Sequence, residues 1–147
     1  MGQSFVAPNP DYAKAVREAV MGFPVARYVG FELGALAPGR AELVLPYREE
    51  LSQGGGVVQA GIVGMIADVA GGSAAGTLLP PGHILVTCDY TVKLLTPAVG
   101  ERLIARGEVI KPGASLTVSR GDVFVLQGER ERLCATALVT TMAVKLG

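Results

Sequence analysis

The sequence is poor in several residue types, and each shortage excludes a class of protein. Only 5% of its 147 residues are aromatic, although 50% are hydrophobic, so the core has to be built from closely packed aliphatic side chains. Two cysteines and one histidine do not supply an obvious metal site. We therefore expect no metal and no cofactor, and we expect Cys88 and Cys134 to be buried thiols in a reducing compartment.

An excess of charge of one sign is also missing. The 13 basic residues balance 13 acidic ones, and no basic run or polybasic segment offers a footprint for nucleic acid or anionic lipid. The first residues lack the charged and apolar regions of a secretory signal. These absences predict a cytoplasmic protein without nucleic-acid or membrane partners. The length fits a single domain, residues 1–147, with a helical segment over residues 1–24.

Helix and turn signals organise the first third of the chain. Asn9-Pro10 is a good helix start, and Gly22 and Pro24 follow the amphipathic stretch 11–21. One face of that stretch is apolar, comprising Tyr12, Ala15, Val16, Ala19 and Val20. Strands are predicted over residues 31–37 and 40–47, joined at Pro38-Gly39, and a polar loop over residues 48–56 ends in three glycines.

The segment 57–79 is almost wholly apolar and too long for a typical strand. As a helix it would span roughly 30 Å. Asp68 in its middle and Gln59 near its start argue against a membrane span. We predict a buried helix that ends at Pro80-Pro81-Gly82.

The remaining sequence predicts strands. Residues 84–95 alternate between apolar and polar side chains, which indicates a strand with one wet face. Further strands are predicted over 101–111, 115–127 and 133–144, with a charged hairpin loop over 128–132; His83 is predicted to lie in a loop. Consecutive strands that outnumber the helices favour an α+β architecture, in which an antiparallel sheet of about six strands curls around one apolar helix.

Asp68 is the anomaly of this pattern. An unpaired charge among apolar helical neighbours costs several kcal/mol, and its pKa is expected to rise. One interpretation is structural, in which Asp68 caps another element or pairs with a buried arginine. The other is functional, in which the carboxylate acts as a base or nucleophile.

A second candidate feature is the start of the same helix. Free N–H groups and the positive end of the helix dipole there can bind an oxyanion, and the small residues Ala60 and Gly61 would let a carbonyl approach. A mere tight junction is the alternative. Because Ala60 and Asp68 are about 12 Å apart along one helix, a single carbonyl cannot touch both. A shared site would therefore lie at a dimer interface, with two sites per symmetric dimer.

Three stretches, residues 53–76, 86–90 and 95–98, resemble the phenylacetic-acid-degradation-type (PaaI-like) hotdog thioesterases. The resemblance runs from about residue 29 to 143. In that family Asn or Gln is followed six residues later by His-Gly-Gly, with an acidic residue nine after the His. Here Gln53, Gln59-Ala60-Gly61 and Asp68 occupy those places. The resemblance implies a hotdog subunit that hydrolyses acyl-CoA without a metal, as a dimer or a dimer of dimers (a homotetramer).

The resemblance also implies roles for individual residues. Asp68 would be the general base or nucleophile, the Ala60 N–H would polarise the thioester carbonyl, and Gln53 would help place water or the carbonyl oxygen. Thr87 falls where the family often has a Ser or Thr that orients water. The stretch 111–115 resembles the turn near the CoA pantetheine. The implied substrate-binding residues are Lys111, Gly113, Ser115 and Arg120, with a solvated surface role as the alternative for Lys111 and Arg120.

The sequence departs from the family pattern at the helix start, where Gln59 replaces His and Ala60 replaces Gly. Gln59 can donate a hydrogen bond through its amide but cannot transfer a proton at neutral pH. This departure keeps open a second hypothesis, a non-catalytic acyl-CoA-binding protein. A hotdog hydratase is a third, although no His follows Asp68 until His83. A loop position for His83 also argues against a Ser-His-Asp triad.

Overall fold

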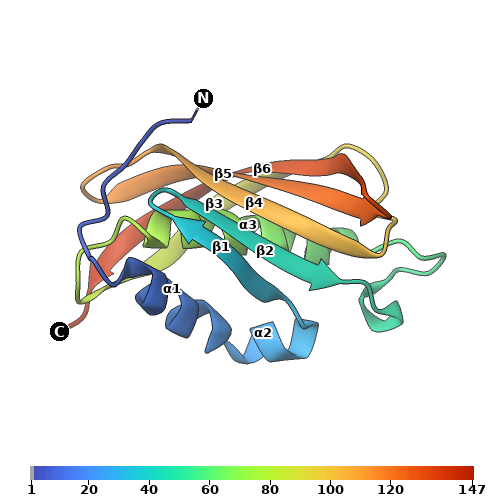
Figure 1. Cartoon of the computed structure of the whole chain (residues 1–147), viewed down its shortest axis with the longest axis horizontal. Coiled ribbons are helices and arrows are strands. Elements are labelled where there is room, and N and C mark those ends of the chain that lie inside the picture. The colour runs from blue at the N-terminus through green and yellow to red at the C-terminus, as the bar shows by residue number, and fades with distance from the viewer. Residues whose placement is uncertain (1) are drawn as a thin grey trace.

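A computed structural model, which describes residues 2–147, has six strands in one antiparallel sheet curled around a long helix (Figure 1). The predicted α+β architecture is confirmed. The sheet order is β1-β2-β4-β5-β6-β3. The helices are α1 (Tyr12–Met21), α2 (Pro24–Val29) and α3 (Ala60–Gly76), with a 3₁₀ turn η1 (Glu49–Leu51). The strands are β1 (Glu32–Ala37), β2 (Arg40–Pro46), β3 (His83–Leu94), β4 (Arg102–Lys111), β5 (Leu116–Gln127) and β6 (Arg130–Lys145).

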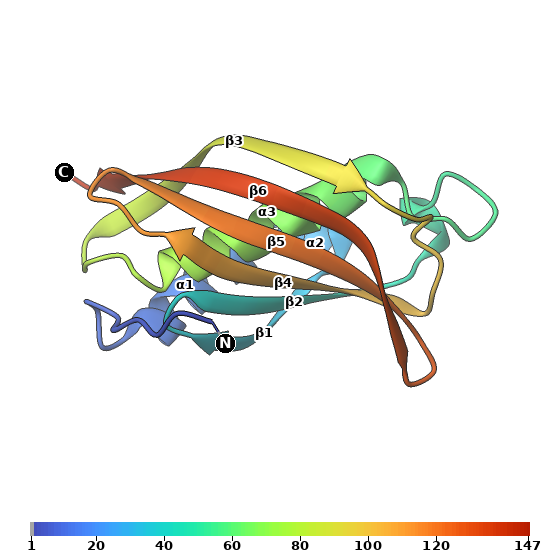
Figure 2. The same cartoon turned by 90° about the horizontal axis from the view of Figure 1, so that it is seen from above.

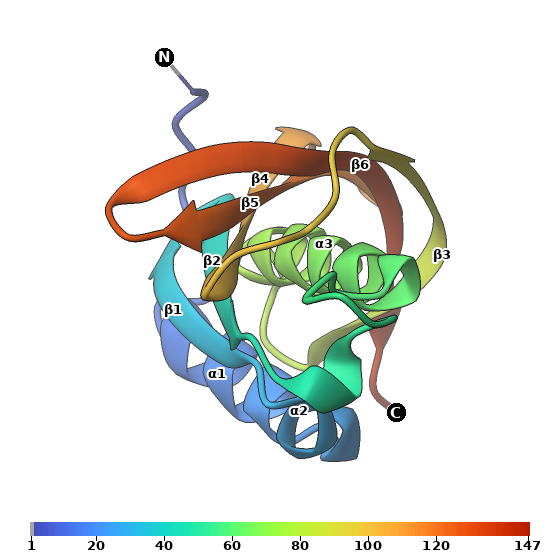
Figure 3. The same cartoon turned by 90° about the vertical axis from the view of Figure 1, so that its right-hand side faces the viewer.

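The N-terminal segment contains two helices where one was predicted. The side chain of Asn9 accepts a hydrogen bond from the Asp11 N–H at 2.9 Å, just before α1 begins. Pro24 does not end a helix but begins α2, because proline is well suited to the first helical position. Gly30, with φ 87°, then ends α2 in the left-handed region. Both helices lie on the side of α3 that the curled sheet leaves open (Figure 3).

A row of small residues lets α3 rest directly on the sheet. Ala41, Gly107, Gly121 and Ala137 are register neighbours across β2, β4, β5 and β6. A Cβ atom at Gly107 would overlap the carbonyl oxygen of Ala70, and one at Gly121 would overlap that of Ala67. The helix backbone therefore touches the sheet backbone, which only glycine permits at these two positions.

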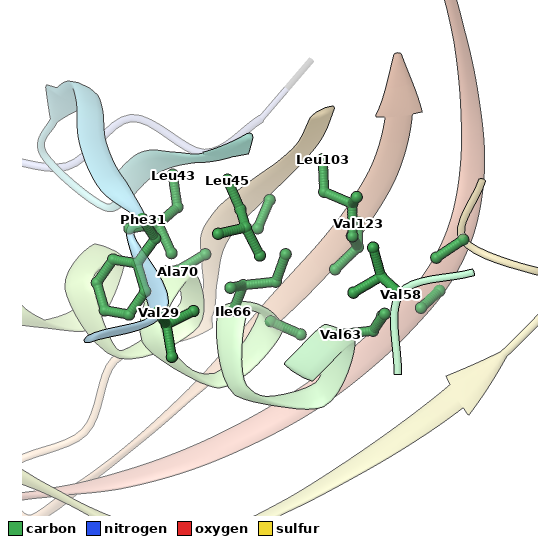
Figure 4. Packing of buried hydrophobic residues seen from close by; sticks show 14 of the residues in the cluster. Val29, Phe31, Leu43, Leu45, Val58, Val63, Ile66, Ala70, Leu103 and Val123 are labelled. Carbon is green, nitrogen blue, oxygen red and sulfur yellow. The ribbon is translucent and has the colours of Figure 1, made fainter. Parts of the chain in front are cut away.

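Aliphatic side chains fill the space on either side of this contact, as the low aromatic content predicts. The cluster around α3 draws on the sheet, on α2 and on the chain that leads into α3 (Figure 4). Its labelled members are Val29, Phe31, Leu43, Leu45, Val58, Val63, Ile66, Ala70, Leu103 and Val123.

The buried helix is shorter at both ends than predicted. Val58 pairs with Ser52 in an isolated bridge and donates its N–H to the Ala98 carbonyl, so it belongs to the loop that enters the helix. At the other end, the Thr77 hydroxyl donates to the Ala74 carbonyl at 2.6 Å and accepts the Gly39 N–H at 2.7 Å. This side chain ties the end of α3 to the β1–β2 hairpin. No helix among residues 2–147 is both long and apolar enough to cross a bilayer.

The uninterrupted alternation of sides predicted over residues 84–95 is wrong, because a bulge breaks it. β3 pairs with β6 in a register that shifts between Thr87 and Asp89, which marks a bulge at Cys88. The bulge turns Thr87 and Tyr90 to the same side as the buried Thr141 and Val139 of β6. Val86, which precedes the bulge, lies on the opposite, exposed side.

Three further expectations need correction around this sheet edge. Cys88 is exposed because it lies at the bulge of an edge strand, whereas Cys134 is buried as predicted. His83 is the first residue of β3 rather than a loop residue, since it pairs with Lys145. The charged residues after Gly128 are mostly strand, because β5 and β6 continue to pair as far as Gln127 and Arg130 (Figure 2).

Candidate functional site

The loop that leads into α3 is a tight turn built on glycine. Gly54, Gly55 and Gly56 all have positive φ angles, of 100°, 62° and 74°, which side-chain-bearing residues rarely adopt. The turn is closed by a hydrogen bond of 2.9 Å from the Gln53 N–H to the Val57 carbonyl. It doubles the chain back so that Gln59 arrives at the helix start in an extended conformation, with ψ 140°.

One backbone donor is left free at the start of α3. The Gln59 side-chain oxygen accepts the Gly61 N–H at 2.6 Å, and the Gln59 carbonyl accepts the N–H groups of Ile62 and Val63. Within residues 2–147 the Ala60 N–H has no hydrogen-bond acceptor. Ala60 lines a pocket of about 300 Å³, together with Gln53, Val57, Val58, Val63, Cys134 and the segment 94–98. The free N–H thus adjoins a cavity at the positive end of the helix dipole.

Asp68 lies two turns further along α3 and is half-buried rather than fully enclosed. Its Oδ1 accepts a hydrogen bond from the Thr87 hydroxyl at 2.9 Å. Burial raises the pKa of the Asp68 carboxyl above its ordinary value of 3.8, and the Thr87 hydrogen bond offsets part of this rise. Among the described residues no arginine pairs with Asp68. The structural alternative of a buried ion pair is therefore wrong.

Asp68 and Ala60 line different cavities of the subunit. Asp68 and Thr87 line a pocket of about 360 Å³ between α1, α3 and β3, whereas Ala60 and Gln53 line the pocket at the helix start. This separation agrees with the rise of about 12 Å expected between the two helical positions. Within one chain, the carboxylate and the free N–H do not face the same space.

Four residues predicted to bind substrate lie away from both pockets. Lys111, Gly113 and Ser115 are exposed where β4 turns into β5. Arg120 is on the outer face of β5, where it lies 3.4 Å from a Glu108 oxygen and 3.3 Å from an Asp122 oxygen. Its charge is already offset by these two carboxylates.

Cys134 is a further titratable residue at the helix-start pocket. Burial raises the pKa of its thiol to about 11, so the thiolate needed for nucleophilic attack is scarce at neutral pH. No group of three or more His, Cys, Asp or Glu side chains gathers in a metal-binding arrangement anywhere in residues 2–147. Because its thiolate is scarce, Cys134 is a poor nucleophile, and the carboxylate of these two cavities is Asp68, in a pocket that Tyr12 and His83 also line.

The wall that α1 contributes to the Asp68 pocket was not predicted from the sequence. Tyr12, Ala15, Val16, Ala19 and Val20 line this pocket, and they are the same residues that form the apolar face of the predicted helix. The signal was thus present in the sequence, but nothing in the sequence showed that this face lies against Asp68.

The raised pKa of Asp68 predicts that the difference in stability between the wild type and the variant Asp68→Asn depends on pH. Because the folded carboxyl holds its proton to higher pH than the unfolded one, raising the pH from 3.8 through the folded pKa lowers the free energy of unfolding. Asp68→Asn keeps an acceptor for Thr87 and removes the charge. We expect it to raise the free energy of unfolding at pH 7 by about 1 kcal/mol or less, since a half-exposed carboxylate retains some hydration.

Urea unfolding at pH 7 and at steps toward pH 4 measures this difference, which should narrow as the pH falls. The exposed Asp89 of β3, which does not line the pocket, supplies the control Asp89→Asn. Equal pH trends for the wild type and Asp68→Asn would show that burial does not raise the Asp68 pKa.

Known proteins share this architecture. A family model described as Thioesterase superfamily matches residues 55–132. A Thioesterase family protein from Silicibacter pomeroyi is 39% identical, with a TM-score of 0.89 over 91% of this chain and 98% of the other. The thioesterase HI1161 from Haemophilus influenzae is 22% identical, with a TM-score of 0.79 over 98% of this chain and 94% of the other.

The PaaI protein of the E. coli phenylacetic acid degradation operon shares the fold at lower identity. It is 14% identical, with a TM-score of 0.81, over 96% of this chain and all of the other. The resemblance read from the sequence, to PaaI-like hotdog proteins, is therefore confirmed at the level of the fold.

Proposed function

Because the chain belongs to the Thioesterase superfamily, we propose that it hydrolyses acyl-CoA thioesters to a free acid and CoA. The single observation that carries the proposal is the pair of groups on α3, a free N–H at Ala60 and a carboxylate of raised pKa at Asp68. A free backbone N–H at a helix start stabilises the oxyanion of acyl transfer, and a poised carboxylate activates the attacking group.

The two groups can act on one thioester if they come from two subunits. We propose a symmetric dimer in which Ala60 of one copy faces Asp68 of the other, with two equivalent sites. The edge strand β3 supports this arrangement, because it exposes Tyr90 and Leu94 by 44% and 53% on the side that faces α3. Large exposed apolar side chains beside a candidate site are typical of an interface. A dimer of dimers is the larger assembly proposed.

In the proposed mechanism, the thioester carbonyl oxygen accepts a hydrogen bond from the Ala60 N–H. Asp68 takes a proton from a water molecule, whose oxygen bonds to the carbonyl carbon. The C–S bond then breaks, and the CoA sulfur leaves with the bonding electrons and takes up a proton. The alternative route has Asp68 attack the carbon directly and form an anhydride, which water hydrolyses. Both routes need the ionised carboxylate, and Thr87 holds it in place through its hydroxyl.

Lys111, Gly113 and Ser115 remain the proposed contacts for CoA. Their exposed position at the β4–β5 turn leaves Lys111 accessible to a CoA phosphate. Arg120 remains a proposed contact too, although its ion pairs with Glu108 and Asp122 compete with any phosphate.

The proposal is tested by CoA release from acetyl-, hexanoyl-, decanoyl- and phenylacetyl-CoA, followed with a thiol reagent. Light scattering at the assay concentration reports whether the active species is a dimer or a tetramer. Absence of turnover on every thioester in this panel would sink the proposal. If acyl-CoA still bound, the second candidate, a non-catalytic acyl-CoA-binding protein, would replace the proposed hydrolase. One observation favours this second candidate: the side-chain oxygen of Gln59 accepts the Gly61 N–H, so that this N–H is not free for a substrate.

Ala60→Pro replaces the donor N–H by a ring carbon on the same nitrogen and should lower kcat by about 10²-fold. Ala60 is the first residue of α3, where proline is tolerated, and the extended Gln59 already has the conformation required before proline. The helix should therefore survive, and circular dichroism and the unfolding midpoint check this. Ala60→Ser retains the N–H and is the matched control. A kcat for Ala60→Pro equal to that of the control would remove Ala60 from the mechanism.

A further inference from the structure

The pocket beside Asp68 continues along α3, away from the helix start. Asp68, Gly72 and Gly76 line it at intervals of four residues, so they lie on one face of the helix. The apolar face of α1 forms the opposite wall, and the β3 residues Leu85 and Thr87 line a third side. Its volume of about 360 Å³ is in the range of small-molecule sites.

The lining of this pocket is mostly apolar, and its polar members are Asn9, Tyr12, Asp68, Ser73, His83, Thr87 and Thr141. Thr87 and Asp68 are joined by their hydrogen bond in one part of the pocket wall. His83 and the turn 79–82 form another part of the wall. No lysine or arginine is among the described residues that line it. A negatively charged group inside it would therefore meet the Asp68 carboxylate without a compensating cation, whereas a neutral apolar group would be desolvated favourably.

From this lining we infer that the pocket between α1, α3 and β3 holds an uncharged, apolar acyl chain, and that Gly72 sets how long that chain can be. The inference rests on the proposed function, since it places the chain next to the carboxylate that acts on its thioester. It names the substrate class as neutral acyl groups and excludes acyl groups that end in a second carboxylate.

Gly72 is the position at which the pocket can be filled without disturbing the fold. A Cβ atom built there has no heavy atom within 4 Å, because it points into open space. The neighbouring Gly76 is tighter, since its Cβ would come within 3.3 Å of Val16. Gly72→Leu thus occupies the pocket one helical turn from Asp68, and leucine is a better helix former than glycine.

The test compares the wild type, Gly72→Leu and Ala13→Leu on acetyl-, hexanoyl-, decanoyl- and succinyl-CoA. Ala13 is exposed on α1 and does not line the pocket, so it controls for an added leucine. We expect Gly72→Leu to lower kcat/KM for decanoyl-CoA at least tenfold while acetyl-CoA changes less than about twofold. Ala13→Leu should change neither, and the wild type should use succinyl-CoA least of the four. An equal loss on all chain lengths, or none, would overturn the inference.

A binding measurement separates this inference from the proposed function. Calorimetry with 1-decanol, which is uncharged and needs no turnover, should show binding to the wild type and a loss of at least tenfold in affinity for Gly72→Leu. If no thioester is hydrolysed but decanol binds in this way, the pocket assignment stands and the proposed hydrolysis does not. If decanol fails to bind the wild type, or binds Gly72→Leu equally well, the pocket assignment is wrong even where hydrolysis is observed.

Discussion

Asp68→Asn should reduce kcat/KM for acyl-CoA by about 10³-fold while the dimer and the fold persist. Asparagine has nearly the same shape as aspartate. Its side-chain oxygen can still accept the hydrogen bond that the Thr87 hydroxyl donates to Asp68 at 2.9 Å. It can neither take a proton from water nor form an anhydride, so both proposed routes stop. The carboxylate also costs stability where it is half-buried, which makes the variant an inactive protein that is at least as stable as the wild type.

The measurement is steady-state CoA release at saturating and sub-saturating substrate, paired with light scattering and an unfolding midpoint for each protein. Asp89→Asn removes an exposed carboxylate from the same strand as Thr87 and should keep full activity. Retention of more than a tenth of the wild-type kcat/KM by Asp68→Asn would exclude Asp68 as base and as nucleophile. A loss shared by Asp89→Asn would point to a general charge effect instead.

Gly121→Ala should lower the free energy of unfolding by about 3 kcal/mol, although it adds a single methyl group. The added Cβ would overlap the carbonyl oxygen of Ala67, a backbone atom of α3 that cannot rotate away. The helix would have to lift from the sheet, which opens the packing around Ile66 and Val123, both fully buried. Gly107→Ala, beneath Ala70, should cost about as much, and the double variant should not fold.

Urea titration followed by circular dichroism measures these losses. Gly34→Ala in β1 is the control, since a Cβ there meets its nearest atom, the Glu42 carbonyl oxygen, at an ordinary 3.4 Å. That variant should stay within about 1 kcal/mol of the wild type. A similarly small effect for Gly121→Ala would mean that α3 can shift on the sheet at little cost, and the direct contact of the two backbones would lose its importance.

The parts of the fold that local pattern specifies are the parts that the sequence predicted. The hairpin at Pro38-Gly39, the amphipathic α1 and the long apolar α3 each follow from turn residues or periodicity within a short window. α2 was missed because six residues are too few for a helical period, and because Pro24 can either follow a helix or begin one. The bulge at Cys88 was missed because only the pairing with β6 reveals it.

In the candidate site, too, the residues with a local signal in the sequence were predicted and the contacts between separate elements were not. Asp68 was found because a carboxylate in an apolar helix is anomalous in the sequence itself. The hydrogen bond from Thr87 to Asp68 could not be predicted, because it depends on the bulge that turns Thr87 toward α3. The cover that α1 forms over Asp68 could not be predicted either, because it depends on how separate elements pack. The glycines beneath α3 lie on different strands, and they form one row only once the register of those strands is fixed.

The order of the strands in the sheet differs from their order in the chain, and this has a consequence for synthesis on the ribosome. β3 has one neighbour, β6, so residues 83–94 have no strand to pair with until residues 130–145 have emerged. β1, β2, β4 and β5 can pair with one another during that interval. The strand that carries Thr87 is thus the last to be fixed, and the nascent chain exposes it longest to other chains.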